Sequence, residues 1–344
     1  MGFGDAESRF GICDSFIIYS YIKIRLFGYN VNGKKEQLTL KIYFMEQKKQ
    51  IKKTGKGIEV FAPAKINLSL LIAGRRPDGF HNIETVMAKL AWYDRIIIEP
   101  GKKEGIELIC KGPQWAPQGR ENLVYRACRL LLKDAGRSAN LKITLWKNIP
   151  AGSGLGSASS DAAATLIGVK KFLRLKVKKG KLGKIAEILG SDVPFFLNGP
   201  LAYCTGKGER VKKISKKFNF LAVLVLPGVN ISTKMVYNNY RHDEVLYRRL
   251  HRQIAGSLKR KSLDLIADLC ANMLQRSCFG INSKLGRLKS RLETLTNGKW
   301  CLTGSGSALF CIFGPGQNRV AKRCLKKVEE KTGCSGIIVT NNRW

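Results

Sequence analysis

The run best suited to chemistry spans residues 150–164, where PAGSGLGSASSDAAA joins a strand-like segment to an alanine-rich one. Glycines let backbone N–H groups approach a ligand closely and adopt positive φ. The helix that follows carries positive partial charge at its N-terminus, and Ser159 or Ser160 can cap it. This combination predicts a phosphate-binding loop. The alternative is an ordinary glycine-rich connection leading into a capped helix.

The loop departs from two common nucleotide-binding motifs. The Walker pattern G-x-x-x-x-G-K-[ST] is absent. A G-x-G-x-x-G fingerprint starting at Gly154 would need a third glycine where Ser159 stands. The acid expected about 20 residues further on is missing too, because residues 170–184 hold eight Lys or Arg and no acid. An NADP-binding variant could use such a basic residue, so a dinucleotide site stays open as a minor alternative.

Two charged residues on either side of the loop could act on a bound phosphate or hydroxyl. Lys65 interrupts an apolar strand-like run, APAKINLSL, and Asp192 precedes Pro194, which suits the first turn of a short helix. Taken alone, Lys65 fits a snorkelling or edge-strand lysine, and Asp192 fits an N-cap carboxylate. Neither role excludes a function, because a capped aspartate is held rigidly.

Two further segments carry candidate ligand contacts. RRPDGFH (75–81) is a turn-bearing loop that ends in Phe80 and His81. An isolated histidine usually has no special role, and a phenylalanine usually belongs to the core. LTGSGSALF (302–310) alternates glycine with small residues, which is typical either of a hairpin turn or of a second loop that closes over phosphates.

The elements that must position these residues follow from periodicity. Predicted strands cover 58–74 with an interruption at Pro63, 83–100 with a turn inside, 141–146, 220–227, 299–313 as a hairpin, and 336–340. Predicted helices cover 121–135, 161–173, most of 235–296, and 318–333. Strands and helices in both halves predict an α+β chain with two domains, 58–217 and 218–344.

Residues 1–57 read as a basic extension and linker. One or two strands are expected there, followed by the lysine-rich stretch MEQKKQIKKTGKG, and Met45 is a plausible alternative start. The apolar run at 16–22 is far shorter than the ~20 residues that a membrane-spanning helix needs. We therefore expect no membrane partner.

The composition is that of a globular protein. The 344 residues are 44% hydrophobic and 25% charged, which excludes a disordered chain, a collagen-like fibre and a small disulfide scaffold. The net charge of +36 is spread along the chain, and no RNA-binding or zinc pattern accompanies it, which argues against a nucleic-acid partner. Ten cysteines without a C-x-x-C pair predict buried thiols in a reducing cytoplasm.

Six segments together resemble the GHMP superfamily of small-molecule kinases: PAKINLSL (63–70), GRRPDGFH (74–81), ENLVYRA (121–127), the 150–164 loop, LGSDVPFFLNGPLAYCTGKGE (189–209) and LPGVNISTKMVY (226–237). They are most similar to the branch that phosphorylates a cytidine diphosphate conjugate of 2-C-methyl-D-erythritol on its 2-hydroxyl, in the non-mevalonate isoprenoid pathway. The resemblance covers 58–344, and residues 1–57 have no counterpart.

The resemblance implies a ribosomal-S5-domain-2-like N-terminal domain, a ferredoxin-like C-terminal domain, ATP as co-substrate and Mg²⁺. It implies that Lys65 and Asp192 are catalytic and that Asn67 lies near the accepting hydroxyl. Phe80 and Tyr237 would sandwich the cytosine, which His81 would recognise. The remaining implied contacts are Gly304 and Gly306 for the substrate, and for ATP Pro150, Ala151, Gly152, Ser153, Gly154, Leu155, Gly156, Ser157, Ala158, Ser159 and Ser160, with Asn122, Leu123 and Lys147 at the adenine.

One departure from the family pattern lies in the loop itself. The family usually has GLGGGSS, whereas Ser157 and Ala158 follow Gly156 here, so we expect altered nucleotide affinity rather than loss of activity. Two alternatives remain open: a kinase of the same superfamily acting on mevalonate or homoserine, and a basic nucleic-acid-binding protein. The sequence leaves the metal ligands and the choice between monomer and homodimer undetermined.

Overall fold

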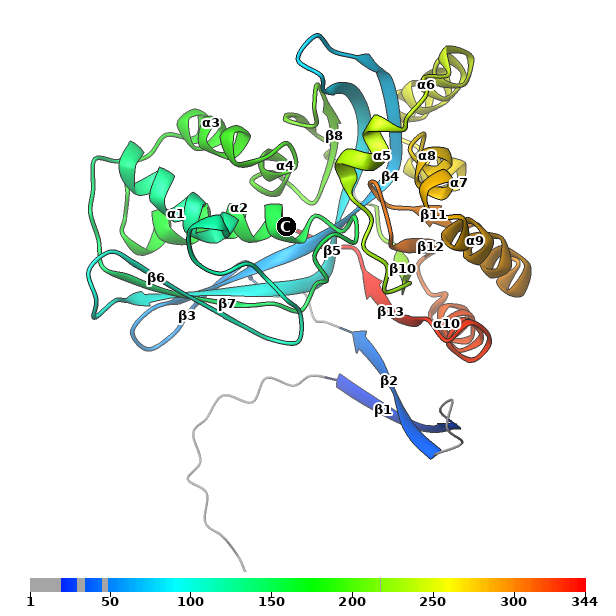
Figure 1. Ribbon diagram of the computed structural model, residues 1–344, viewed down its shortest axis with the longest axis horizontal. Coiled ribbons are helices and arrows are strands. Elements are labelled where there is room, and N and C mark those ends of the chain that lie inside the picture. Colours follow the sequence, from blue (N-terminus) through cyan, green and yellow to red (C-terminus); the bar gives the residue numbers. More distant parts are fainter. Residues whose placement is uncertain (1–19, 30–34, 45–48, 217) are drawn as a thin grey trace, which may run out of the picture. The chain divides into compact units, whose positions relative to one another are not determined.

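The computed structural model describes residues 20–29, 35–44, 49–216 and 218–344, and the chain forms two compact units, Met1–Phe44 and Met45–Trp344 (Figure 1). In the first unit, β1 (Ser20–Tyr29) and β2 (Lys35–Phe44) pair as an antiparallel hairpin. The expectation of one or two strands in the extension is therefore confirmed. Met45 itself, like Cys13, lies outside the described residues.

A seven-stranded sheet occupies the N-terminal half of the second unit. Its strands are β3 (Ile51–Lys53), β4 (Ile58–Arg75), β5 (His81–Pro100), β6 (Ile106–Lys111), β7 (Leu141–Trp146), β8 (Leu201–Thr205) and β9 (Arg210–Lys213). The order is β3-β4-β5-β7-β6, with β8 paired to β5 and β9 to β8. Because β3 pairs with β4, the last part of the basic extension is built into this sheet.

The two longest strands are continuous where the sequence predicted breaks. β4 runs through Pro63, and the pairing with β5 shifts register between Pro63 and Lys65. Proline cannot donate to the ladder, and an irregularity of this kind accommodates it without ending the strand. β5 is likewise unbroken because its first half pairs with β8 and its second half with β7.

Four α-helices accompany this sheet in the described part of the N-terminal half: α1 (Leu123–Asp134), α2 (Ser157–Phe172), α3 (Lys179–Leu189) and α4 (Val193–Phe196), with a short 3₁₀ turn at Gly119–Glu121. The largely buried helix α2 packs against β4 and β5. Its start corrects one prediction. Gly156, at φ 71°, is the N-cap and has no side-chain cap, so Ser159 and Ser160 lie inside the first turn rather than capping it.

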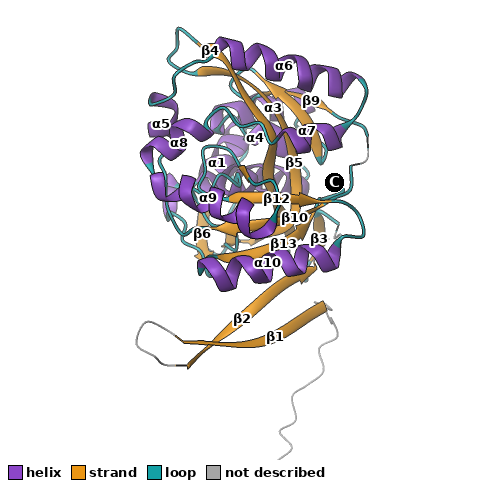
Figure 2. Cartoon of the chain, turned by 90° about the vertical axis from the view of Figure 1, so that its right-hand side faces the viewer, coloured by secondary structure: helices purple, strands orange, loops and turns teal. Residues whose placement is uncertain are grey.

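The C-terminal half contains a second sheet, made of β10 (Leu221–Leu226), β11 (Cys301–Leu302), β12 (Leu309–Phe313) and β13 (Ser335–Thr340). The order β11-β12-β10-β13 is antiparallel throughout and, with helices between β10 and β11 and between β12 and β13, it has the ferredoxin-like arrangement. The helices are α5 (Thr233–Asn238), α6 (Glu244–Lys259), α7 (Leu263–Leu269), α8 (Gln275–Ile281), α9 (Ser283–Thr296) and α10 (Asn318–Thr332). Figure 2 shows α9 and α10 on the face of this sheet. The α+β prediction is confirmed, while a domain boundary at residue 217 stays a prediction.

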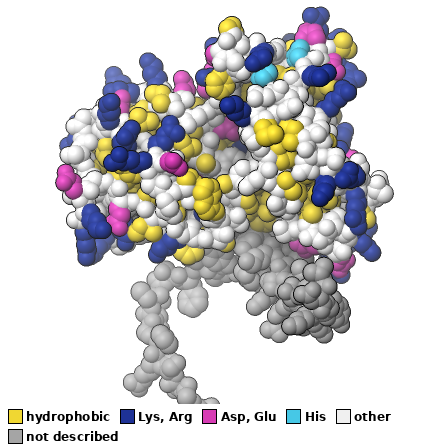
Figure 3. All heavy atoms as spheres, in the orientation of Figure 1, with side chains coloured by type: hydrophobic (Ala, Val, Ile, Leu, Met, Phe, Trp, Pro, Cys, Tyr) yellow, Lys and Arg dark blue, Asp and Glu magenta, His cyan; other side chains and the backbone are white. Residues whose placement is uncertain are grey.

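Most described cysteines are buried thiols, as predicted, for example Cys128, Cys204 and Cys311. Cys270 and Cys301 differ from that expectation, because the structure joins them in a disulfide with a Cα–Cα distance of 5.4 Å. Across the described ranges, we find no helix with the length and apolar character that crossing a membrane requires. On the face shown in Figure 3, lysines and arginines are scattered among other side chains, consistent with a dispersed charge.

Candidate active site

The structure brings Lys65 and Asp192 together. Lys65 lies on β4 and is 3% exposed, and its Nζ is 3.6 Å from Asp192 Oδ2. Asp192 stands just before α4, with Pro194 in the first turn, but its carboxylate makes no capping hydrogen bond. The carboxylate instead faces Lys65 and keeps about a third of its side chain (33%) exposed. A buried cation and an accessible anion therefore meet at one point on the surface.

Asn67 and Thr303 fix the surroundings of the Lys65 ammonium. Lys65 Nζ donates to Asn67 Oδ1 at 2.7 Å, and Asn67 Nδ2 donates to Thr85 Oγ1 at 2.8 Å. The Thr303 hydroxyl accepts the Asn67 backbone N–H at 3.2 Å and donates to Asn67 Oδ1 at 3.3 Å. Sequence reasoning missed Thr303, because a threonine in a glycine-rich turn carries no distinguishing signal. The network holds Asn67 beside Lys65.

The two glycine-rich loops pack against each other and against Lys65. The Lys65 backbone N–H donates to Leu155 O at 2.9 Å. A Cβ on Gly154, which has φ +80°, would lie 2.1 Å from Thr303 O, and a Cβ on Gly304 would lie 3.4 Å from Lys65 Nζ. Glycine is thus required where the loops cross. Gly304 borders the Lys65–Asp192 pair, so both loops line the same site.

The first loop presents backbone groups and hydroxyls ahead of α2. Ser153 Oγ donates to Pro150 O at 2.8 Å and shapes the turn. Ala158 is exposed and Ser159 half-buried, while the buried Ser160 hydroxyl has no hydrogen-bond partner in the described residues. The N–H groups of the first helical turn have no intrahelical acceptors. This end of α2 can therefore bind an anion.

The other loop residues lie as follows. Ala151 is half-buried and Gly152 is exposed, and a Cβ on Gly152 would approach Asn230 Oδ1 to 2.9 Å. A Cβ on Gly306 would meet Cys278 Sγ at 3.1 Å. Gly306 therefore lies close to α8, and its contact with a substrate stays a prediction.

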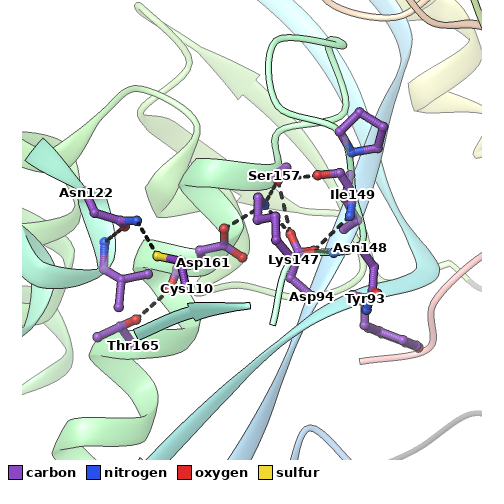
Figure 4. A network of polar contacts seen from close by, with 12 residues as sticks. Tyr93, Asp94, Cys110, Asn122, Lys147, Asn148, Ile149, Ser157, Asp161 and Thr165 are labelled. Atoms are coloured by element: carbon purple, nitrogen blue, oxygen red, sulfur yellow. Dashed lines mark hydrogen bonds and ion pairs between the residues drawn. The ribbon is translucent and has the colours of Figure 1, made fainter. Parts of the chain in front are cut away.

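A buried ionic cluster anchors both ends of the first loop (Figure 4). Lys147 Nζ forms ion pairs with Asp161, at 2.8 Å, and with Asp94, and it contacts the Ser157 hydroxyl. Burial and the neighbouring Asp94 carboxylate raise the pKa of Asp161, and the two carboxylates outweigh burial and raise the pKa of Lys147. The Ser157 hydroxyl also lies 3.3 Å from Ile149 O. Ser157, at the position where the family usually has glycine, thus ties residue 149 to the start of α2.

The three residues assigned to the adenine pocket have structural partners. Asn122 Oδ1 caps α1 by accepting the Val124 N–H at 2.8 Å, and Asn122 Nδ2 donates to Pro117 O at 2.7 Å. Leu123 packs against the core, and Lys147 is 2% exposed. Their contact with a nucleotide stays a prediction. Beside Asn122 lies a cavity of about 390 Å³ lined by residues that include Cys110 and the exposed Trp115.

An aromatic cluster forms the other end of the site. The His81 ring lies 5.4 Å from that of Tyr237 on α5 and 5.8 Å from that of Tyr240. Burial lowers the pKa of His81 and raises that of Tyr237. Phe80 is 54% exposed, with Lys207 Nζ 4.7 Å from its ring centroid. Phe80 therefore exposes its ring, while His81 lies against Tyr237. Stacking of a planar ligand between Phe80 and Tyr237 stays a prediction.

Glu84 fixes α6 to β5 behind this cluster. It accepts a hydrogen bond from the Tyr247 hydroxyl at 2.9 Å and lies 2.7 Å from His251 Nδ1. Among the residues that the structure describes, no three His, Cys, Asp or Glu are grouped to hold a metal ion.

The glycine loop before a buried helix, the Lys–Asp pair beside it and the ferredoxin-like second half agree with the resemblance to GHMP kinases, and the comparisons with known proteins support it. The family of GHMP kinase N-terminal domains matches residues 122–200. A homoserine kinase from Cytophaga hutchinsonii shares the fold, with a TM-score of 0.66, 17% identity and coverage of 85% of this chain and 96% of its own. A curated relative at 35% identity is named as a kinase as well, so the chain is a small-molecule kinase that uses ATP.

Proteins with higher sequence identity to this chain identify one family within the GHMP kinases. The chain is 35% identical over 264 residues to 4-diphosphocytidyl-2-C-methyl-D-erythritol kinase of Chloroherpeton thalassium. The matched residues make up 76% of this chain and 91% of that relative. The enzyme of the same name from Citrifermentans bemidjiense is 34% identical over 262 residues, which make up 75% of this chain and 90% of that enzyme. A crystal structure of 4-(cytidine 5'-diphospho)-2C-methyl-D-erythritol kinase matches with a TM-score of 0.65 and 31% identity, covering 83% of this chain and all (100%) of that one. The chain belongs to the 4-diphosphocytidyl-2-C-methyl-D-erythritol kinase family.

Proposed function

We propose that this chain transfers the γ-phosphoryl group of ATP to the 2-hydroxyl of 4-(cytidine 5'-diphospho)-2-C-methyl-D-erythritol, a step of the non-mevalonate isoprenoid pathway. The observation that carries the proposal is the meeting of Lys65 and Asp192, 3.6 Å apart, at the crossing of the two glycine loops. Phosphoryl transfer depends mainly on in-line positioning and on compensation of charge. A loop that can bind phosphate and a carboxylate that can orient a hydroxyl lie side by side there, which supports the proposal.

Asp192 and Lys65 act on the accepting alcohol. The exposed part of the Asp192 carboxylate receives and orients the hydroxyl and takes its proton as the new bond forms. The Lys65 ammonium, fixed by Asn67 Oδ1 at 2.7 Å, stabilises the negative charge that develops on the oxygen. Asn67 supports this geometry from beside the hydroxyl.

The loop ahead of α2 receives the triphosphate of ATP. Its backbone N–H groups and the positive helix end compensate phosphate charge. Mg²⁺ takes oxygen ligands, many of them phosphate and water, and the half-buried Ser159 hydroxyl at the start of α2 is the kind of oxygen that would help to hold it beside the phosphates. When bound, Mg²⁺ would neutralise part of the phosphate charge.

The aromatic cluster selects the cytosine. Phe80 and Tyr237 present ring faces for stacking, and His81 presents ring nitrogens for a hydrogen bond. His81 is half-buried, and a base that left its ring nitrogens unpaired would bind less well. We further propose that residues 58–217 and 218–344 are two domains, and that the enzyme works in the cytoplasm, where its charged substrate would be retained.

The proposal is tested by measuring ADP release from ATP with three acceptors: the cytidine diphosphate conjugate, mevalonate and homoserine. We expect turnover with the conjugate alone, and ³¹P NMR of the product should place the new phosphate on the 2-hydroxyl of the erythritol moiety. Faster turnover with mevalonate or homoserine would contradict the proposal and favour a different acceptor for the same fold.

A further inference from the structure

A third buried lysine, Lys89 on β5, belongs neither to the Lys65–Asp192 pair nor to the ionic cluster around Lys147. It is 1% exposed, and within the described residues no carboxylate lies within 4.0 Å of its Nζ. The ammonium donates instead to two backbone carbonyls, Phe196 O at 3.1 Å and Asn198 O at 2.7 Å. Burying a cation without a counter-charge is costly, so this side chain needs an explanation.

The two carbonyls close the short helix that begins after Asp192. The last carbonyls of a helix have no intrahelical donors, and a cation near them is favourable. The Leu197 and Asn198 N–H groups turn back to Pro194 O at 3.2 Å and Phe195 O at 3.0 Å, which leaves the oxygens of residues 196 and 198 to Lys89. Lys89 thus fixes the C-terminal end of α4.

Lys65 fixes the opposite end of the same segment. Lys65 and Lys89 are directly paired residues of β4 and β5, so their side chains project from the same face of the sheet. One reaches Asp192, before α4, at 3.6 Å, and the other reaches the carbonyls after it. A single rung of the sheet therefore holds both ends of residues 192–198.

We propose that Lys89 is a positioning residue for the phosphoryl-transfer reaction, which sets the place of Asp192 by holding the far end of α4 on the sheet. The inference rests on the proposed function of Asp192. The backbone bond from the Lys89 N–H to Pro200 O, at 2.8 Å, secures the chain just beyond the same turn and survives replacement of the side chain.

Packing alone does not account for Lys89. Phe195 and Phe196 are 0% and 2% exposed, so apolar packing accounts for the middle of α4 but not for the hydrogen bonds at its carbonyl end. The Lys89 ammonium lies 5.9 Å from the Phe195 ring centroid and 5.8 Å from the Trp344 ring centroid, and a methionine side chain can occupy the same space beside both rings. Lys89→Met therefore removes the two hydrogen bonds while retaining most of the volume.

The test compares Lys89→Met, Lys89→Arg and Lys142→Met, a half-buried lysine on β7 that makes the matched control. With ATP and the cytidine conjugate, we expect Lys89→Met to lower kcat about 10- to 100-fold, since displacement by an ångström has effects of this size, and to leave the KM for ATP within twofold. Lys89→Arg, which keeps a donor, should recover part of kcat, and Lys142→Met should match the wild type.

Two further readouts separate positioning from general stability. Amide exchange at Leu197 and Asn198 should accelerate in Lys89→Met, whether or not the cytidine conjugate is the true acceptor. In an Asp192→Asn background the effect of Lys89→Met on the single-turnover rate should largely vanish, because residues acting through one another are not additive. Unchanged exchange and kcat in Lys89→Met, or equal losses in kcat and ATP affinity, would overturn the inference. Absent turnover in the wild type with faster exchange in the variant would instead overturn the proposed function alone.

Discussion

Replacing Lys65 by methionine should slow the chemical step without unfolding the protein. We take the 3.6 Å between Lys65 Nζ and Asp192 Oδ2 as the separation between the ammonium and a bound substrate oxygen. At that separation two unit charges interact by roughly 5 kcal/mol when the effective dielectric constant is about 20. The accepting oxygen develops a fraction of a unit charge. If that fraction is about half, the lost stabilisation is roughly 2–3 kcal/mol, and kcat should fall about 30- to 200-fold.

The same variant leaves the surrounding network largely intact. Asn67 Oδ1 loses the Lys65 donor at 2.7 Å but keeps the Thr303 hydroxyl at 3.3 Å. One net hydrogen bond is worth about 1 kcal/mol, so thermal unfolding should shift only slightly.

The assay is rapid-quench measurement of the first turnover with saturating ATP and cytidine conjugate, with Lys142→Met as the control for lysine-to-methionine replacement. We expect a slower first turnover, nearly unchanged ATP affinity and a folded protein by circular dichroism. A single-turnover rate within threefold of the wild type would refute the role assigned to Lys65.

Three other changes have expected outcomes. Gly154→Ala should abolish measurable nucleotide binding, because at φ +80° the new Cβ would lie 2.1 Å from Thr303 O. Gly316→Ala is the control: Gly316 has φ +85° but no atom of the described residues within 4 Å of the position that a Cβ would take, so this change should only lower stability. Tyr237→Ala should raise the KM for the cytidine conjugate roughly 10- to 30-fold through lost stacking and burial, with the KM for ATP unchanged. Burial lowers the pKa of Lys89 to about 7 from an ordinary 10.5, so between those values the unfolded chain binds the extra proton. The free energy of unfolding should therefore rise with pH across that window, and less so in Lys89→Met.

A specific result would contradict each of these three predictions. Nucleotide binding by Gly154→Ala equal to that of Gly316→Ala would show that the loops need not cross at Thr303. An unchanged KM for the conjugate in Tyr237→Ala would remove the aromatic cluster from substrate recognition. Equal pH slopes of unfolding in the wild type and in Lys89→Met, measured by urea titration between pH 7 and 9, would show that Lys89 is not the titrating group.

Much of the site was within reach of the sequence because its motifs are local. The glycine loop, the RPDGFH turn and SDVPFF are each a short stretch of sequence, and they occur in the same order as in the family that the chain resembles. Periodicity also located helices such as α1 and α10 within two or three residues of their ends. These features depend on neighbours along the chain.

Features that depend on partners across the fold were missed. Pro63 read as a strand end, but a register shift opposite β5 accommodates it. Lys65 and Lys89 both interrupt apolar strands, and only their pairing shows that they serve opposite ends of one helix. Asp94 lies in another apolar run, and its meeting with Lys147 could not be read from either segment.

The most direct test of the account is a crystal structure with a non-hydrolysable ATP analogue and the cytidine conjugate bound together. We predict that the 2-hydroxyl lies within about 2.6–3.2 Å of the Asp192 carboxylate, that Lys65 Nζ faces the same oxygen, and that the γ-phosphate rests on the loop from Gly154 to Ser157. A hydroxyl held away from Asp192, or a triphosphate bound elsewhere, would contradict it.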